Sequence, residues 1–178
     1  FGAFLDLKFR EYDYYVGVSV WSVGLDGAVE PEGTTVAWTN EPTGITLASE
    51  RRVFVSDDVS KTVFEIDTGD DGLVGTTDDV LVNSFGTVAF GLIDPEDITY
   101  DPTRNRLHLV DGSHRQVYTL EPGPDGRFQG GGDDVITSFD TASAGVDDPE
   151  GIIYDRDNDT LLVVDYSDSM AVEFGPDG

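Results

Sequence analysis

The chain has 178 residues, of which 36 are acidic and 10 are basic, so its formal net charge is −26. This charge argues against nucleic acid and anionic membrane surfaces as partners, because both are themselves negative. The hydrophobic content of 38% indicates a folded protein, and the absence of cysteine excludes disulfides and thiolate chemistry. The acidity fits divalent-cation binding, solubility in high salt or plain surface solvation.

Residues 1–33 form a separate N-terminal segment in which residues 4–10 and 14–21 are predicted strands, rich in alternating, aromatic and β-branched side chains. We expect Trp21, and Trp38 further on, to pack on strands. The run Phe9-Arg10-Glu11-Tyr12-Asp13-Tyr14-Tyr15 with Gly17-Val18 resembles a segment near the end of some bacterial patatin-like phospholipases. The Gly-x-Ser-x-Gly nucleophile motif of that family is absent, so the resemblance implies no activity.

A repeat occupies the remaining residues, 34–178. Asp57, Asp111 and Asp165 recur at equal intervals, and each follows a short apolar run. Each run is preceded by a related phrase: Glu41-Pro42-Thr43-Gly44-Ile45, Asp94-Pro95-Glu96-Asp97-Ile98 and Asp148-Pro149-Glu150-Gly151-Ile152. A period of about 50 residues built from short apolar runs is typical of β-propeller blades.

Each repeat predicts four short strands separated by turn residues. The strands expected are 44–48, 53–56, 63–67 and 80–85, then 98–101, 106–110, 116–120 and 135–139, then 151–154, 161–164 and 171–174. Residues 34–39 are expected to be the outer strand of a preceding blade. The sequence therefore predicts an all-β fold with about three propeller blades of four antiparallel strands, over residues 41–87, 94–141 and 148–178.

Three blades are too few to close a ring, which needs about four. Three arrangements remain: a homodimer that forms a six-bladed ring, an open piece of a larger ring, or further strands supplied by residues 1–32. We favour the homodimer, because exposed strand edges and apolar faces tend to find partners.

The repeat pattern Pro-x-Gly-Ile-x-x-Asp, Leu-x-Val-x-Asp and Val-x-x-Phe resembles the NHL and gluconolactonase (SMP-30)-like propellers over residues 41–178. The resemblance implies that acids at the ends of the inner strands hold a divalent ion at the central channel. The residues in those positions are Asp57, Glu96, Asp111, Glu150 and Asp165. The alternative is that these acids cap turns by accepting backbone N–H groups.

A second candidate metal site is the loop from Asp67 to Asp79. Acids stand at positions 1, 5 and 12 of this loop (Asp67, Asp71 and Asp78, followed by Asp79), and Gly72 stands at position 6. This is close to the spacing of a 12-residue Ca²⁺ loop, in which carboxylates and carbonyls supply the 6–8 oxygens that the ion prefers. The alternative is a glycine-rich turn with solvated acids.

The same theme returns in the second repeat, with Glu121, Asp125, Asp133 and Asp134, and begins again at Glu173 and Asp177. Neither complete loop ends in the bidentate Glu of the usual helical hand. We therefore expect modest calcium affinity, with a Kd of about 10⁻⁴–10⁻³ M.

The two histidines, His108 and His114, are expected at the surface. Asp111, Ser113 and His114 are too close along the chain to place a serine nucleophile and its base in catalytic geometry.

The leading functional hypothesis is a calcium-stabilised, extracellular or periplasmic propeller that serves as a binding or scaffold module for an unknown protein or small molecule. The alternative is a metal-dependent hydrolase of lactones, esters or phosphoesters, with its ion at the channel. No apolar run approaches the length of about 18 residues that a membrane helix needs.

Overall fold

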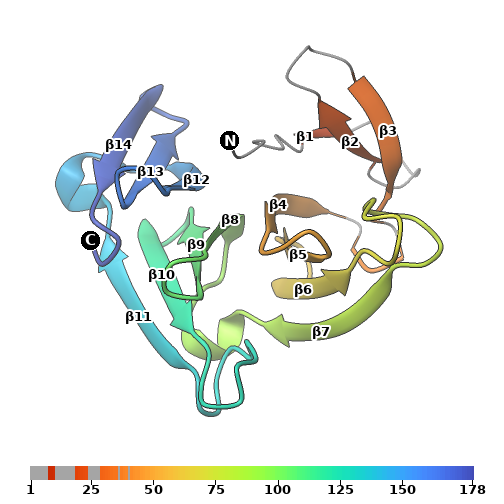
Figure 1. Ribbon diagram of the computed structural model, residues 1–178. Coiled ribbons are helices and arrows are strands. Elements are labelled where there is room, and N and C mark those ends of the chain that lie inside the picture. The colour runs from red at the N-terminus through yellow and green to blue at the C-terminus, as the bar shows by residue number, and fades with distance from the viewer. Residues whose placement is uncertain (1–7, 11–18, 24–28, 36, 40) are drawn as a thin grey trace.

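The structure is a computed structural model that describes residues 8–10, 19–23, 29–35, 37–39 and 41–178. The described residues form four antiparallel sheets and two short 3₁₀ turns, η1 (Val88–Phe90) and η2 (Ala142–Ala144). The sheets stand one after another around an arc, with β4, β8 and β12 nearest its centre (Figure 1). The predicted all-β propeller architecture is confirmed.

The three repeats form three consecutive sheets of this arc. The first contains β4 (Pro42–Leu47), β5 (Arg52–Asp57), β6 (Thr62–Asp67) and β7 (Val80–Gly86). The second contains β8 (Pro95–Asp101), β9 (Arg106–Asp111), β10 (Gln116–Glu121) and β11 (Val135–Asp140). The third contains β12 (Pro149–Asp155), β13 (Thr160–Asp165) and β14 (Met170–Phe174). We call these the first, second and third blades. In each, the strand order in space is the order in sequence, as expected from short hairpin connections.

The N-terminal segment supplies a fourth sheet, with β1 (Lys8–Arg10), β2 (Ser19–Val23) and β3 (Val29–Thr34). The predicted strand over residues 34–39 is therefore wrong, because the strand ends where it was expected to begin. Residues 4–7 and 14–18 of the other predicted strands, with much of the patatin-like segment, lie outside the described residues.

The β3 strand ends at Thr34 because a buried threonine follows the last strand of this sheet, as it does in the next two sheets. Thr35, Thr87 and Thr141 are all fully buried. Each accepts a backbone hydrogen bond at its carbonyl from the residue three positions later, namely Trp38, Phe90 and Ala144. Thr35 therefore corresponds to Thr87 and Thr141. It begins the tight turn before β4, and β3, which precedes it, is an outer strand.

The core lies between the blades. We call the second strand of each blade (β5, β9 or β13) its middle strand, and in the first two blades this strand is covered on both faces. Consecutive residues Val53, Phe54 and Val55 of β5 are fully buried, and so are residues 107–110 of β9. A run of consecutive buried residues, all apolar in β5 and interrupted only by His108 in β9, is typical of a strand that lies between two layers. The largest apolar cluster includes Phe54 of the first blade with Leu92 and Phe128 of the second. Packing between neighbours therefore stabilises each blade.

Hydrogen bonds join the inner strands of adjacent blades. The Tyr100 N–H donates to Thr46 Oγ1 over 3.1 Å, and in the next pair the Tyr154 N–H donates to Thr99 Oγ1 over 3.1 Å. Asp97 of β8 adds a further link, since its carboxylate accepts from the Ile152 N–H of β12 over 2.8 Å. Burial raises the pKa of Asp97 to about 7.

Gly44 of β4 makes room for this link. A Cβ at Gly44 would lie 2.3 Å from Asp97 Oδ1 and 2.7 Å from the Asp97 Cα. We predict that Gly44→Ala lowers the free energy of unfolding by about 1–3 kcal/mol, because the backbone of β8 must move. Gly131→Ala is the control, since its Cβ would meet nothing within 4 Å. Equal stability of the two variants in denaturant titrations would contradict the prediction.

Candidate functional site

Asp57, Asp111 and Asp165 are the last residues of β5, β9 and β13, and their carboxylates are buried. Each carboxylate accepts the N–H of the residue three positions later, Ser60, His114 or Asp168, over 2.6–2.8 Å. Each also accepts an N–H from the segment that enters the inner strand of the same blade, at Glu41, Ile93 and Asp147 respectively. These aspartates therefore fasten two turns together.

Hydrogen bonding keeps two of these carboxylates ionised. Burial alone would raise the pKa of Asp57, but hydrogen bonds from Thr39 and Ser60 outweigh it and lower that pKa. The Asp168 N–H, against a smaller effect of burial, lowers the pKa of Asp165 to about 2. The capping role is thus visible in the geometry, and metal ligation by Asp57, Asp111 or Asp165 stays a prediction.

A compact acidic cluster lies beside these caps, formed by Asp58, Asp94 and Glu96. One carboxylate oxygen from each residue lies within 4.8 Å of the others, which makes this the one group of three potential metal ligands among the described residues. Asp58 follows β5 of the first blade, whereas Asp94 precedes β8 and Glu96 lies on it. The cluster therefore spans the seam between two blades. Carboxylate oxygens at this spacing are suited to a hard divalent cation.

The surroundings of the acidic cluster are strongly negative. Burial, followed by the negative charges of Glu150, Asp94 and Asp58, raises the pKa of Glu96 to about 7. The Glu150 side chain is exposed, but partial loss of water and the charges of Asp148, Asp94 and Asp58 raise its pKa too. The pKa values of Glu96 and Glu150 are thus raised by burial and by neighbouring negative charge. At Asp94, by contrast, burial is outweighed by hydrogen bonds from Ser113 and Asp58 and by the charge of Lys61, which lower its pKa.

One cation and one hydroxyl partly offset this excess. Lys61 forms ion pairs with Asp58 and, over 3.5 Å, with Asp94. Ser113 Oγ donates to Asp94 over 2.6 Å. Of the sequence-predicted channel acids, the structure brings Glu96 to this cluster with Glu150 in electrostatic range, and sequence reasoning missed Asp58 and Asp94. The available signals were the Asp57-Asp58 pair and the Asp94-Pro95-Glu96 phrase.

The first predicted calcium loop is held by its own backbone. Asp78 Oδ2 accepts the Asp70 N–H over 2.8 Å, and Asp79 Oδ2 accepts the Gly75 N–H over 2.6 Å. Asp71 accepts the Leu73 N–H, and Asp67 pairs with Arg51 over 3.0 Å. The structure does not bring three of these carboxylates within ligand reach of one another.

The second loop is similar. Asp134 Oδ2 accepts the N–H groups of Gln129 and Gly130, and Asp125 accepts the Arg127 N–H. The Gln129 side chain donates to Asp125 and Asp133. Glu121 pairs with Arg106, as does Asp177 of the third copy. Calcium binding by either loop stays a prediction.

The histidines occupy contrasting positions. His114 is exposed as expected, with Nδ1 3.2 Å from Asp111 Oδ2. Ser113 donates to Asp94, so the local Asp-Ser-His run forms no triad. The surface position predicted for His108 is wrong, because this residue is fully buried. On a strand covered by blades on both faces, alternation does not bring every second residue to the surface.

No known protein family matches the chain, and no curated protein matches it in sequence. Solved structures do match. A luciferin-regenerating enzyme is 14% identical with a TM-score of 0.57, and covers 85% of this chain and 45% of its own. A chain of a nidogen/laminin complex is 20% identical with a TM-score of 0.55, and covers 89% and 53%.

Regucalcin from Agrobacterium tumefaciens, described as a calcium-binding protein, is 12% identical with a TM-score of 0.58, and covers 89% of this chain and 52% of its own. This chain thus spans about half the length of these proteins. No described helix is long and apolar enough to cross a membrane. Sheet order, blade packing and these matches together show that the chain has a β-propeller fold, similar to the SMP-30/regucalcin and nidogen propellers.

Proposed function

We propose that this protein is a calcium-binding β-propeller module, with its ion at the cluster of Asp58, Asp94 and Glu96. The observation that carries the proposal is the convergence of three carboxylates from two blades within 4.8 Å. The raised pKa of Glu96 supports it, because a divalent cation would offset both the burial and the repulsion by neighbouring carboxylates that raise this pKa. The calcium-binding description of regucalcin, a structural neighbour, agrees with this choice of ion.

Binding at this position would join the first and second blades, because Asp58 belongs to one and Glu96 to the other. The ion would then stabilise the ring and shape a surface beside its centre, as expected for a binding or scaffold module. Three carboxylates without a preformed cage suggest modest affinity, which suits the calcium concentrations outside the cytoplasm. We therefore also propose an extracellular or periplasmic location.

We predict by isothermal titration calorimetry that Ca²⁺ binds with a Kd of about 10⁻⁴–10⁻³ M and raises the Tm. Glu96→Gln should weaken binding at least about tenfold, since it removes a charged ligand. The matched control is Asp71→Asn, which removes one carboxylate from the first predicted loop and should leave the affinity unchanged. Loss of binding in Asp71→Asn with retention in Glu96→Gln would place calcium in the loop and overturn the proposed site.

A metal-dependent hydrolase is the second candidate, favoured by the raised pKa values of Glu96 in the cluster and of Glu150 beside it. A carboxyl whose pKa is raised toward the working pH can act as a general acid or base. Glu150 is the candidate base, since it lies outside the group of three ligands. Glu150→Gln should then slow hydrolysis of a lactone, aryl ester or phosphoester about 10²-fold or more, with calcium affinity kept. No turnover with Ca²⁺, Mg²⁺, Mn²⁺ or Zn²⁺ would exclude this function.

We also propose self-association through the outward face of the third blade, which includes Ile153 and Val164, 49% and 47% exposed. The equivalent second-blade residues, Thr99 and Val110, are buried beneath the third blade. This face is therefore of the kind that a neighbouring blade covers elsewhere in the chain. The predicted six-bladed ring counted three blades in each chain and left out the β1–β3 sheet. We therefore propose this contact without fixing the number of blades in the assembly.

Light scattering should give about twice the 19.3 kDa chain mass. Added salt should strengthen the dimer, because it screens the repulsion between two chains of charge −26. Val164→Glu should produce monomers. The control Val135→Glu, at a site 56% exposed on β11, should not. A wild-type monomer at all salt concentrations would contradict the proposal.

A further inference from the structure

A buried histidine occupies the seam between the second and third blades. His108 of β9 is fully buried, and its ring stacks on that of Tyr154 of β12, with centroids 6.5 Å apart and an interplanar angle of 18°. Its Nδ1 shares a hydrogen bond of 2.9 Å with Thr119 Oγ1. Its buried Nε2 has no hydrogen-bond partner among the described residues.

The seam between the first and second blades shows the apolar counterpart of this arrangement. There Phe54 of β5 stacks on Tyr100 of β8, with centroids 6.4 Å apart and an interplanar angle of 28°. Phe54 and His108 stand at the same place in the repeat, since Phe54 pairs with Glu65 and His108 with Thr119. The second seam thus has an ionisable ring where the first has a benzyl group.

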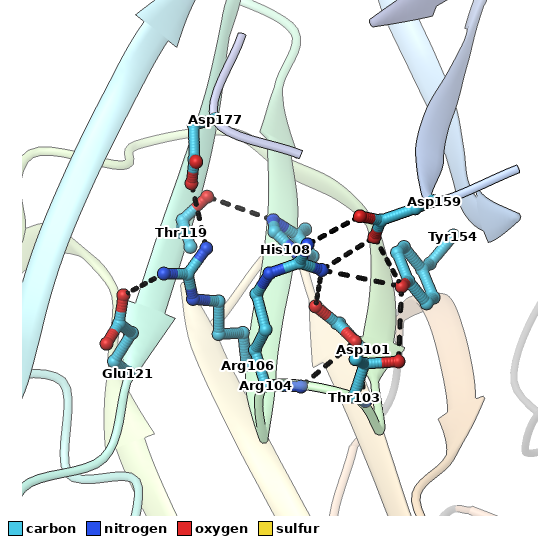
Figure 2. Close-up of polar contacts among 10 residues, drawn as sticks. All are labelled: Asp101, Thr103, Arg104, Arg106, His108, Thr119, Glu121, Tyr154, Asp159 and Asp177. Carbon is cyan, nitrogen blue, oxygen red and sulfur yellow. Dashed lines mark hydrogen bonds and ion pairs between the residues drawn. The ribbon is translucent and has the colours of Figure 1, made fainter. Parts of the chain in front are cut away.

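Charged residues surround His108 from every side of the seam (Figure 2). From the second blade, Arg104 pairs with Asp101 over 2.9 Å, and Arg106 pairs with Glu121. From the third repeat, Asp159 binds Arg104 over 2.6 Å and Asp177 binds Arg106 over 2.8 Å. The Tyr154 hydroxyl donates to Asp159 over 2.8 Å. The nearby carboxylates therefore already have arginine partners.

We infer that His108 is an acid-sensitive latch, whose protonation loosens the third blade from the second. An imidazolium would need an acceptor at Nε2, and the described residues of the closed seam supply none. It would also add a positive charge beside Arg104 and Arg106. The proton can be accommodated only if the seam opens and admits water.

The direction in which stability changes with pH follows from the pKa shift of His108. Burial lowers the pKa of His108 from 6.5 to about 4; the smaller effects of Asp101 and Asp177 oppose this shift, and those of Arg106 and Arg104 add to it. Between these values the unfolded chain binds more protons, so stability falls as the pH falls from 6.5 to about 4. The pKa of Asp159, about 2 because of Arg104 and Tyr154, places the loss of its ion pair below this window. Glu96 and Asp97, with raised pKa values, act in the opposite direction, so a comparison of variants is required.

The first test is His108→Phe, which copies the apolar seam. When the pH is lowered from 8 to 5, the Tm of the wild type should fall relative to that of His108→Phe by roughly 4–8 °C. Hydrogen exchange in residues 149–174, corrected for intrinsic rates, should accelerate at pH 5 in the wild type but not in His108→Phe. The control His114→Gln removes the exposed histidine and should behave as the wild type. Parallel Tm curves for the wild type and His108→Phe would overturn the inference.

A second measurement needs no variant at position 108. The chain has 2 histidines, so NMR of the wild type resolves both imidazole titrations, assigned with His114→Gln. The His108 signal should remain that of neutral imidazole down to about pH 5, whereas exchange in residues 149–174 should already become faster as the pH falls below 6.5. A His108 that titrates at an ordinary pKa without such exchange would contradict the latch.

Discussion

The constraint on which this structure depends is that the middle strands β5 and β9 are covered on both faces. A β-sheet of three or four strands has two faces, and nearly all the side chains on both faces of β5 and β9 are buried. Water cannot replace a neighbouring blade on such a strand without a large loss of hydrophobic stabilisation. The Tyr100–Thr46 and Tyr154–Thr99 hydrogen bonds then set the register in which one blade meets the next. The stability and the register of each blade therefore depend on the blade beside it.

The repeat divides its acidic residues between two tasks. The aspartate that ends each middle strand, such as Asp57, turns inward and satisfies backbone donors, which is a structural need of every blade. The residue after this aspartate does not have that structural role. In the first blade it is Asp58, which lies close to Asp94 and Glu96 across the seam, whereas the second and third blades have Gly112 and Tyr166 at this position. One seam can therefore differ in chemistry from the next without any change of fold.

The fold could be predicted from the sequence because its signals are local and repeated. Recurring aspartates, apolar runs and turn residues predicted the strands of the three repeats to within a few residues. The acidic cluster could not be predicted, because Asp58 and Glu96 come from different blades and their proximity depends on how two sheets pack. The loop acids show the converse limit. Asp71 and Asp78 have the spacing of calcium ligands, but the same carboxylates can accept N–H groups of their own loop, and spacing alone does not separate these outcomes.

Lys61 gives the acidic cluster a property that its carboxylates alone would lack. Its backbone is left-handed, with φ of 52°, and its carbonyl accepts hydrogen bonds from the Thr87 N–H and hydroxyl. The turn therefore holds the base of this side chain in a fixed place while the ammonium group reaches Asp58 and Asp94. The protein carries its own counter-ion, so the ion-free state does not bear the full repulsion of three carboxylates. A divalent cation that bound at this cluster would have to displace the Lys61 ammonium group from Asp58 and Asp94.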